Sequence, residues 1–124
     1  MQAARQRNTA PEIAIRRRLF ACGLRYRVDH RVIPSLNRRA DIVFVGARVA
    51  VFVDGCFWHG CPRHGTKPRA NAAWWSEKLA KNRHRDLETT RVLKRANWHV
   101  IRIWEHEDSE RAVARITIAL RERR

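Results

Sequence analysis

Residues 40–54 read Ala-Asp-Ile-Val-Phe-Val-Gly-Ala-Arg-Val-Ala-Val-Phe-Val-Asp, and this stretch decides the fold. It holds two runs rich in β-branched and aromatic residues, 40–45 and 49–54, which are joined by a tight connection. Such a pattern predicts a β-hairpin. Asp41 begins the first strand and Asp54 ends the second, and these two ends lie side by side in an antiparallel pair. We therefore expect the two carboxylates to converge at one edge of a sheet.

Helical and extended patterns surround this hairpin on both sides. The expected elements are a helix over 8–24, a strand over 26–28, the strands 40–45 and 49–54, a helix over 72–96, a strand over 98–104 and a helix over 111–120. Alternation of this kind predicts an α/β fold in which one central mixed sheet is flanked by helices.

The length of 124 residues suits one domain with one hydrophobic core, so we expect residues 1–124 to form a single domain. No stretch approaches the roughly 20 apolar residues of a membrane span, and the N-terminus lacks the apolar run of a secretory signal. The sequence therefore predicts a cytoplasmic protein without a membrane partner, and we expect it to act as a monomer.

The chain is strongly basic, with 27 lysines and arginines against 12 acidic residues and a net charge of +15. In residues 1–40 ten arginines face only Glu12 and Asp29. This charge indicates a polyanionic partner, and nucleic acid fits better than a membrane surface because no helix pairs a basic face with a broad aromatic face. The run of arginines at 16–18 is either a set of phosphate contacts or a solvated face.

The segment 55–64 packs two thiols, two imidazoles and two aromatic rings into ten residues. Cys56, Cys61 and His64 have the donor types and short spacing of a structural zinc site, and His106 is the best placed fourth ligand. The remaining cysteine, Cys22, falls in the first helix, where we expect it to fill space in the core.

Asp41 and Asp54 are the strongest candidates for chemistry. Cleavage of a phosphodiester needs carboxylate oxygens that hold Mg²⁺ against the scissile phosphate, and apolar strands are a costly place for carboxylates without such a use. The alternative is that both acids merely cap strand ends at the surface. Because two like charges at adjoining strand ends repel, we expect a cation between them.

At this point a family resemblance becomes specific. The run 40–43 followed by 51–59 resembles the signature of the very-short-patch-repair (Vsr) DNA mismatch endonucleases, and the similarity extends over nearly the whole chain. The resemblance implies a restriction-endonuclease-like α/β core with a structural zinc. It also implies an Mg²⁺-dependent enzyme that nicks one strand of duplex DNA at a T:G mismatch.

The resemblance assigns roles to single residues. Asp41 would be the principal Mg²⁺ ligand, with the main-chain carbonyl of Val53 beside it. His59 would be the general base that activates the attacking water, and Glu12 would reach the metal through a water molecule. The family's reference member has threonine and histidine where Val53 and Asp54 stand. Asp54 is therefore a departure from the family pattern, and we expect it to act as a second acidic metal ligand.

The same resemblance makes Cys56, Cys61, His64 and His106 the zinc ligands, although two positions exchange Cys and His relative to the reference member. Either residue type binds zinc. Phe57 and Trp58 would wedge into the base stack beside the mismatch, and a place in the core is their alternative. We expect the other four tryptophans to be core residues: Trp74, Trp75, Trp98 and Trp104.

The expected partner is thus duplex DNA that carries a mismatch, and mismatch-repair proteins are further candidates. Two other functions stay open at this stage. One is a related nuclease that cuts unmismatched or modified DNA, and the other is a zinc-stabilised DNA-binding module without catalysis. The presence of Asp41, Asp54 and His59 together argues against the second, because binding alone needs none of them.

Overall fold

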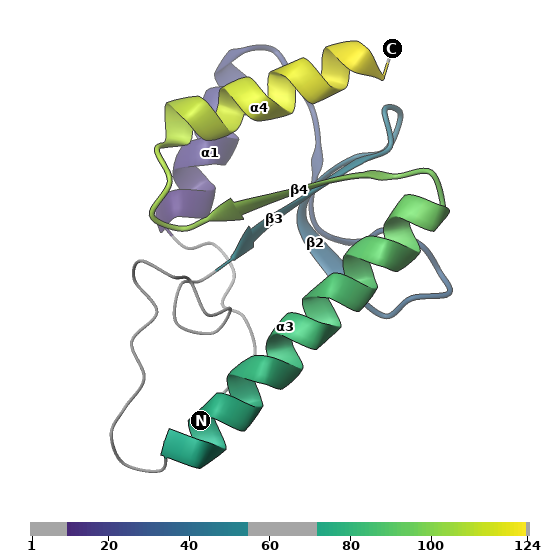
Figure 1. The fold of residues 1–124 in the computed structure, drawn as a ribbon. Coiled ribbons are helices and arrows are strands. Elements are labelled where there is room, and N and C mark those ends of the chain that lie inside the picture. The colour runs from purple at the N-terminus through teal and green to yellow at the C-terminus, as the bar shows by residue number, and fades with distance from the viewer. Residues whose placement is uncertain (1–9, 55–71, 124) are drawn as a thin grey trace.

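A computed structural model of the chain describes residues 10–54 and 72–123. The elements are α1 (Ala10–Ala21), β1 (Arg27–Arg31), β2 (Arg39–Phe44), β3 (Val49–Asp54), α3 (Ala72–Arg95), β4 (His99–Trp104) and α4 (Ser109–Glu122), as Figure 1 shows. The order of helices and strands expected from the sequence is confirmed, and the bounds differ from the expected ones by a few residues.

The four strands form one mixed sheet in the order β1-β2-β3-β4. β2 and β3 are the expected antiparallel hairpin, with Ile42 opposite Val51 and Phe44 opposite Val49. β4 runs parallel to β3, and Asp54 stands opposite Trp104 at their carboxyl ends. A parallel pair needs a long crossover, and α3 lies in that crossover.

Helices cover both faces of the sheet, with α1 and α4 on one face and α3 on the other (Figure 1). On the first face, Ile15 of α1 and Ile116 of α4 pack in one cluster with Val51. On the second face, Leu93 of α3 packs with Phe52. All six residues of β3 are buried, which explains why its sequence is apolar from Val49 to Val53 and does not alternate.

α3 is a charged helix of 24 residues with one buried side. Leu79 and Leu93 are buried, Asn82 and Asp86 are partly buried, and Arg83 is exposed, so the helical spacing expected from the sequence is confirmed. Among residues 10–54 and 72–123, no helix is both long enough and apolar enough to cross a membrane.

Two expectations about single residues are wrong. Cys22 is exposed rather than buried, because α1 ends at Ala21 and Gly23 adopts φ +85° to stop the helix. The Leu24 N–H donates to the Leu19 carbonyl and the Gly23 N–H to the Phe20 carbonyl, which closes the helix end. Trp74 is 56% exposed, whereas the other three tryptophans expected in the core are partly buried.

The two leucines Leu93 and Leu87 on α3 give a matched test of this packing. Leu93 is 0% exposed and Leu87 is 66% exposed. We predict that Leu93→Ala lowers the free energy of unfolding by about 2–4 kcal/mol, since it opens a cavity against β3. Leu87→Ala should change it by less than about 0.5 kcal/mol. Urea unfolding followed by circular dichroism measures both, and equal losses would contradict the assignment of the second core face.

Candidate functional site

The candidate site lies where β2 begins and β3 ends. Asp41 and Asp54 are both 4% exposed, so neither is a surface cap of its strand. Because β2 and β3 are antiparallel, the first residues of β2 lie beside the last residues of β3. The two acids therefore occupy adjoining strand ends, while the convergence of their carboxylates and their roles as metal ligands stay predictions.

Asp41 is held by the backbone of the neighbouring strand. The Val53 N–H donates to Asp41 Oδ2 at 2.6 Å. The residue pairing of the two strands runs from Phe44–Val49 to Ile42–Val51, and the carboxylate accepts a backbone N–H just beyond it. A buried carboxylate needs such donors, since burial without them is costly.

The backbone also determines which oxygen lies near Asp41. In an antiparallel pair, a residue that directs its N–H to the partner strand directs its C=O the same way, so the Val53 carbonyl lies on the β2 side. The next carbonyl, that of Asp54, accepts the Glu105 N–H at 2.9 Å on the β4 side. A carboxylate and a carbonyl on one side of β3 are hard oxygen donors, and this donor set fits Mg²⁺.

Asp54 has a cationic neighbour in the protein itself. Arg102 Nη1 lies 3.1 Å from Asp54 Oδ1 and 3.3 Å from Oδ2. Arg102 comes from the middle of β4, opposite Phe52. A guanidinium group therefore pairs with Asp54, and a divalent cation between the two acids stays a prediction.

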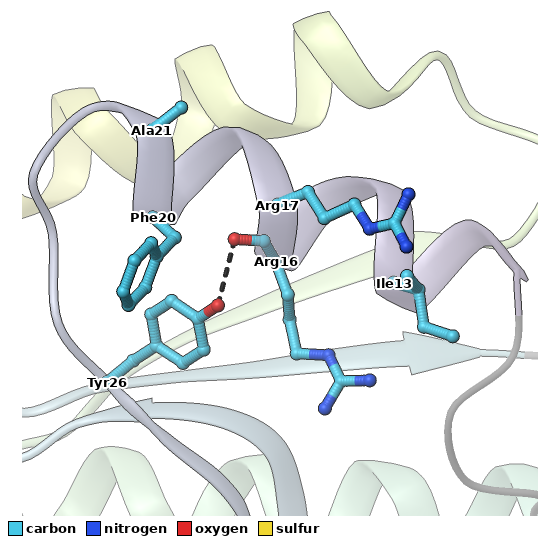
Figure 2. A pocket seen from close by; sticks show the side chains of 6 residues that line it. All are labelled: Ile13, Arg16, Arg17, Phe20, Ala21 and Tyr26. Carbon is cyan, nitrogen blue, oxygen red and sulfur yellow. Dashed lines mark hydrogen bonds between the residues drawn. The ribbon is translucent and has the colours of Figure 1, made fainter.

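Glu12 lies in the first turn of α1 and is 2% exposed. Its carboxylate forms an ion pair with Arg16 at 3.7 Å. In Figures 1 and 2, α1 begins at the end of the sheet where the strand arrows of β3 and β4 point. Glu12 is therefore on the same end of the sheet as the two aspartates, while its role towards a metal stays a prediction.

The other predicted catalytic and DNA-contacting residues, His59, Phe57 and Trp58, lie outside the described residues. The structure therefore gives no geometry for the general base or for the aromatic wedge.

Three of the four predicted zinc ligands, Cys56, Cys61 and His64, also lie outside the described residues. His106 follows β4, is partly buried and stacks on Trp104, with ring centroids 6.5 Å apart and planes at 11°. Within the described ranges 10–54 and 72–123, no three His, Cys, Asp or Glu side chains are grouped so that they could hold a metal ion.

Sequence reasoning missed one functional candidate, Arg102. The signal was a single charged residue in the otherwise apolar and aromatic stretch 100–104. The strand pattern predicted the strand correctly but not the reason for the charge, which depends on Asp54 and on α3.

A pocket of about 360 Å³ lies elsewhere, beside α1. Figure 2 shows its lining, which consists of Ile13, Arg16, Arg17, Phe20, Ala21 and Tyr26. The Tyr26 hydroxyl donates to the Arg16 carbonyl at 2.8 Å and ties the chain after the helix to α1. None of the predicted catalytic residues lines this pocket, so we separate it from the candidate site.

Comparison with known proteins relates the chain to DNA-cleaving enzymes. A family model described as DNA mismatch endonuclease Vsr matches residues 1–64. The chain is 47% identical over 122 residues to the type II nicking enzyme V.NaeI of Lentzea aerocolonigenes, covering 97% of this chain and 74% of the relative. It is 39% identical over 112 residues to the type II nicking enzyme V.XorIIP of Xanthomonas oryzae pv. oryzae, covering 89% and 79%. It is 34% identical over 106 residues to the DNA mismatch endonuclease Vsr of Escherichia coli, covering 85% and 66%.

Proposed function

The chain belongs to the Vsr family of DNA mismatch endonucleases, and we propose that this endonuclease nicks one strand of duplex DNA at a T:G mismatch with the help of Mg²⁺. The observation that carries the proposal is the buried Asp41 carboxylate, fixed by the Val53 N–H at the end of the central strand. An acid in that position is costly for the fold unless it has a use.

Asp41 and the Val53 carbonyl are the proposed Mg²⁺ ligands, with Asp54 as a second acid and Glu12 acting through water. Bound there, the ion would polarise the scissile phosphate and neutralise the charge that develops on it. Support comes from the donor chemistry, since both inner ligands offer hard oxygens on one side of β3.

His59 is the proposed general base. It takes a proton from the attacking water as the new O–P bond forms. The P–O3′ bond breaks, and the leaving 3′ oxygen takes a proton from solvent, which leaves a 5′-phosphate and a 3′-hydroxyl. Phe57 and Trp58 are the proposed wedge beside the mismatch, where unstacking is least costly. The sequence places these three residues within five positions after Asp54, which supports a shared location near the acids.

Cys56, Cys61, His64 and His106 are the proposed ligands of a structural Zn²⁺. The four residues offer thiolate and imidazole donors, the set that tetrahedral zinc prefers. His106 is the second residue after β4, and the end of β4 lies beside the end of β3 that leads into the cysteine segment. A zinc ion would thus link the segment after β3 to the turn after β4.

Duplex DNA is the proposed partner, and the net charge of +15 supports a polyanion. The exposed cations of α3 include Arg83, Arg85 and Arg91, which are available for phosphate contacts. A contact with mismatch-repair proteins is a further proposal without a surface assigned to it.

A second candidate is nicking of duplex DNA without a mismatch. It is favoured by one observation, that three similar proteins, 38–47% identical to this chain, are named type II nicking enzymes. The two candidates share the chemistry and differ only in the substrate.

The first prediction separates these candidates. We expect a single-strand nick when the protein and Mg²⁺ are incubated with a T:G duplex, and a nick at least about tenfold slower in the matched duplex, since a mismatched step costs less to unstack. Denaturing gels with each strand labelled in turn measure both rates, and chelation by EDTA should abolish them. Equal rates on both duplexes would favour the second candidate.

The second prediction concerns the catalytic residues. Asp41→Ala should abolish nicking while duplex binding persists, because the carboxylate holds metal and contributes little to docking. His59→Ala should slow the nick by roughly two to four orders of magnitude, the usual range for a general base. Single-turnover nicking and gel-shift binding give the two readouts.

Glu122→Ala and His99→Ala are matched controls, since both side chains are exposed and neither residue belongs to the proposed metal sites or DNA contacts. They should nick at the rate of the unaltered protein. An Asp41→Ala protein that folds but loses binding together with cleavage would make Asp41 a structural residue.

The third prediction concerns zinc. About one zinc ion per chain should co-purify, and Cys61→Ala or His106→Ala should lower the melting temperature, because a structural zinc contributes directly to folding. Elemental analysis and thermal unfolding measure the two effects. His99→Ala, at an exposed position of β4, is the control and should keep its metal. Folded, freshly purified protein without zinc would defeat the assignment.

A further inference from the structure

The side chain of Arg102 extends from β4 to α3 and makes polar contacts with three other residues. Its Nη1 contacts both carboxylate oxygens of Asp54, at 3.1 and 3.3 Å. Its Nη2 donates to the backbone carbonyl of Asp86 at 3.1 Å, and its Nε donates to Thr90 Oγ1 at 3.0 Å. All three guanidinium nitrogens therefore have an acceptor.

The flat face of the same guanidinium is also covered. Its carbon lies 4.4 Å from the centre of the Phe52 ring, a cation–π contact. The side chain of Arg102 is 24% exposed and that of Asp54 is 6% exposed. A planar group bound at three nitrogens and packed on a ring has one orientation, and a lysine could not reproduce this arrangement.

The guanidinium group of Arg102 is shared by two carboxylates. Asp54 lies at 3.1 Å from Nη1, and the Asp86 carboxylate lies at 3.9 Å from the same atom. One cation therefore serves two acids, one on β3 and one on α3. A cation this close to the Asp54 carboxylate reduces the attraction of that carboxylate for a second cation.

We propose that Arg102 is a positioning residue that fixes the Asp54 carboxylate at the end of β3 and sets the divalent-metal affinity of the site. The proposal rests on the proposed function in one respect, which is that Asp54 takes part in metal binding. It goes beyond that function because it assigns the geometry and charge of this acid to a residue of β4 that is anchored on α3.

The test measures metal binding without catalysis. Mn²⁺ binding to the full chain is measured by isothermal titration calorimetry in the absence of DNA, at pH 8. Arg102→Met keeps the apolar stem and removes the charge, so it should bind Mn²⁺ roughly tenfold more tightly than the unaltered protein. Arg102→Lys keeps the charge, so its Mn²⁺ affinity should stay within about threefold of the unaltered protein.

The rate of nicking at saturating metal should move differently. It should fall in both variants by roughly tenfold or more, because neither methionine nor lysine can bind Asp54, Asp86 and Thr90 together. In Arg102→Met, Mn²⁺ binding should therefore become tighter while nicking becomes slower. A merely structural role of Arg102 would not produce opposite changes in these two quantities. If Arg102→Met does not fold, Arg102→Lys alone tests the proposal. Its Mn²⁺ affinity should be unchanged and its nicking rate should be lower than that of the unaltered protein.

Arg18→Met is the matched control, since it also removes one charge and an ion pair, that of Arg18 with Glu110 at 3.4 Å. It should leave the Mn²⁺ affinity within about twofold of the unaltered protein, because that ion pair does not involve Asp54. The double variant Asp54→Asn with Arg102→Met, compared with Asp54→Asn alone, should show no tightening.

Two results would overturn the proposal: a folded Arg102→Met protein with unchanged or weaker Mn²⁺ binding, or tightening that persists in the Asp54→Asn background. A failure of the proposed function looks different. In that case no duplex would be nicked by the unaltered protein, whereas the calorimetric coupling between Asp54 and Arg102 would still be measured.

Discussion

The complete burial of β3 is the constraint on which the rest of the structure depends. A strand that is covered on both faces must satisfy its backbone groups within the protein. β2 provides partners as far as Val51, and the Asp41 carboxylate then accepts the Val53 N–H. The need to satisfy a buried backbone N–H thereby fixes the Asp41 carboxylate to the central strand. The position of this carboxylate is therefore set by the packed core.

The layer between α3 and the sheet changes character along its length. Near the carboxyl end of α3 it is apolar, where Leu93 packs on Ala50 and Phe52. Towards the end of β3 it becomes polar, where Arg102 joins Asp54 to the backbone of Asp86. Since each polar group there has a partner, the layer tolerates burial of charge while the apolar part supplies the packing. Apolar packing and charged contacts therefore lie at different positions along one helix.

Much of the fold could be predicted because it depends on local patterns: the two apolar runs around a short turn gave the hairpin, and the helical spacing gave α3. The environments of single residues could not be predicted where they depend on tertiary geometry. The environment of Cys22 was predicted wrongly because α1 ends at Ala21, just before it, and that of Trp74 because it lies on the exposed side of α3. The two aspartates could be singled out because acids are rare in apolar strands. The role of Arg102 could not be predicted, because its partners lie 12, 16 and 48 residues before it in the sequence.

The partners of the two acids also bear on what holds them in the fold. Like charges at adjoining strand ends require compensation, and a bound metal was the compensation that the sequence suggested. In the structure, each acid has a protein partner of its own: a backbone N–H for Asp41 and a guanidinium for Asp54. These contacts require no ion, so the described part of the chain can keep both carboxylates buried and oriented before a metal arrives. A divalent cation would then meet acids that are already in position, and the binding free energy would not be spent on ordering them.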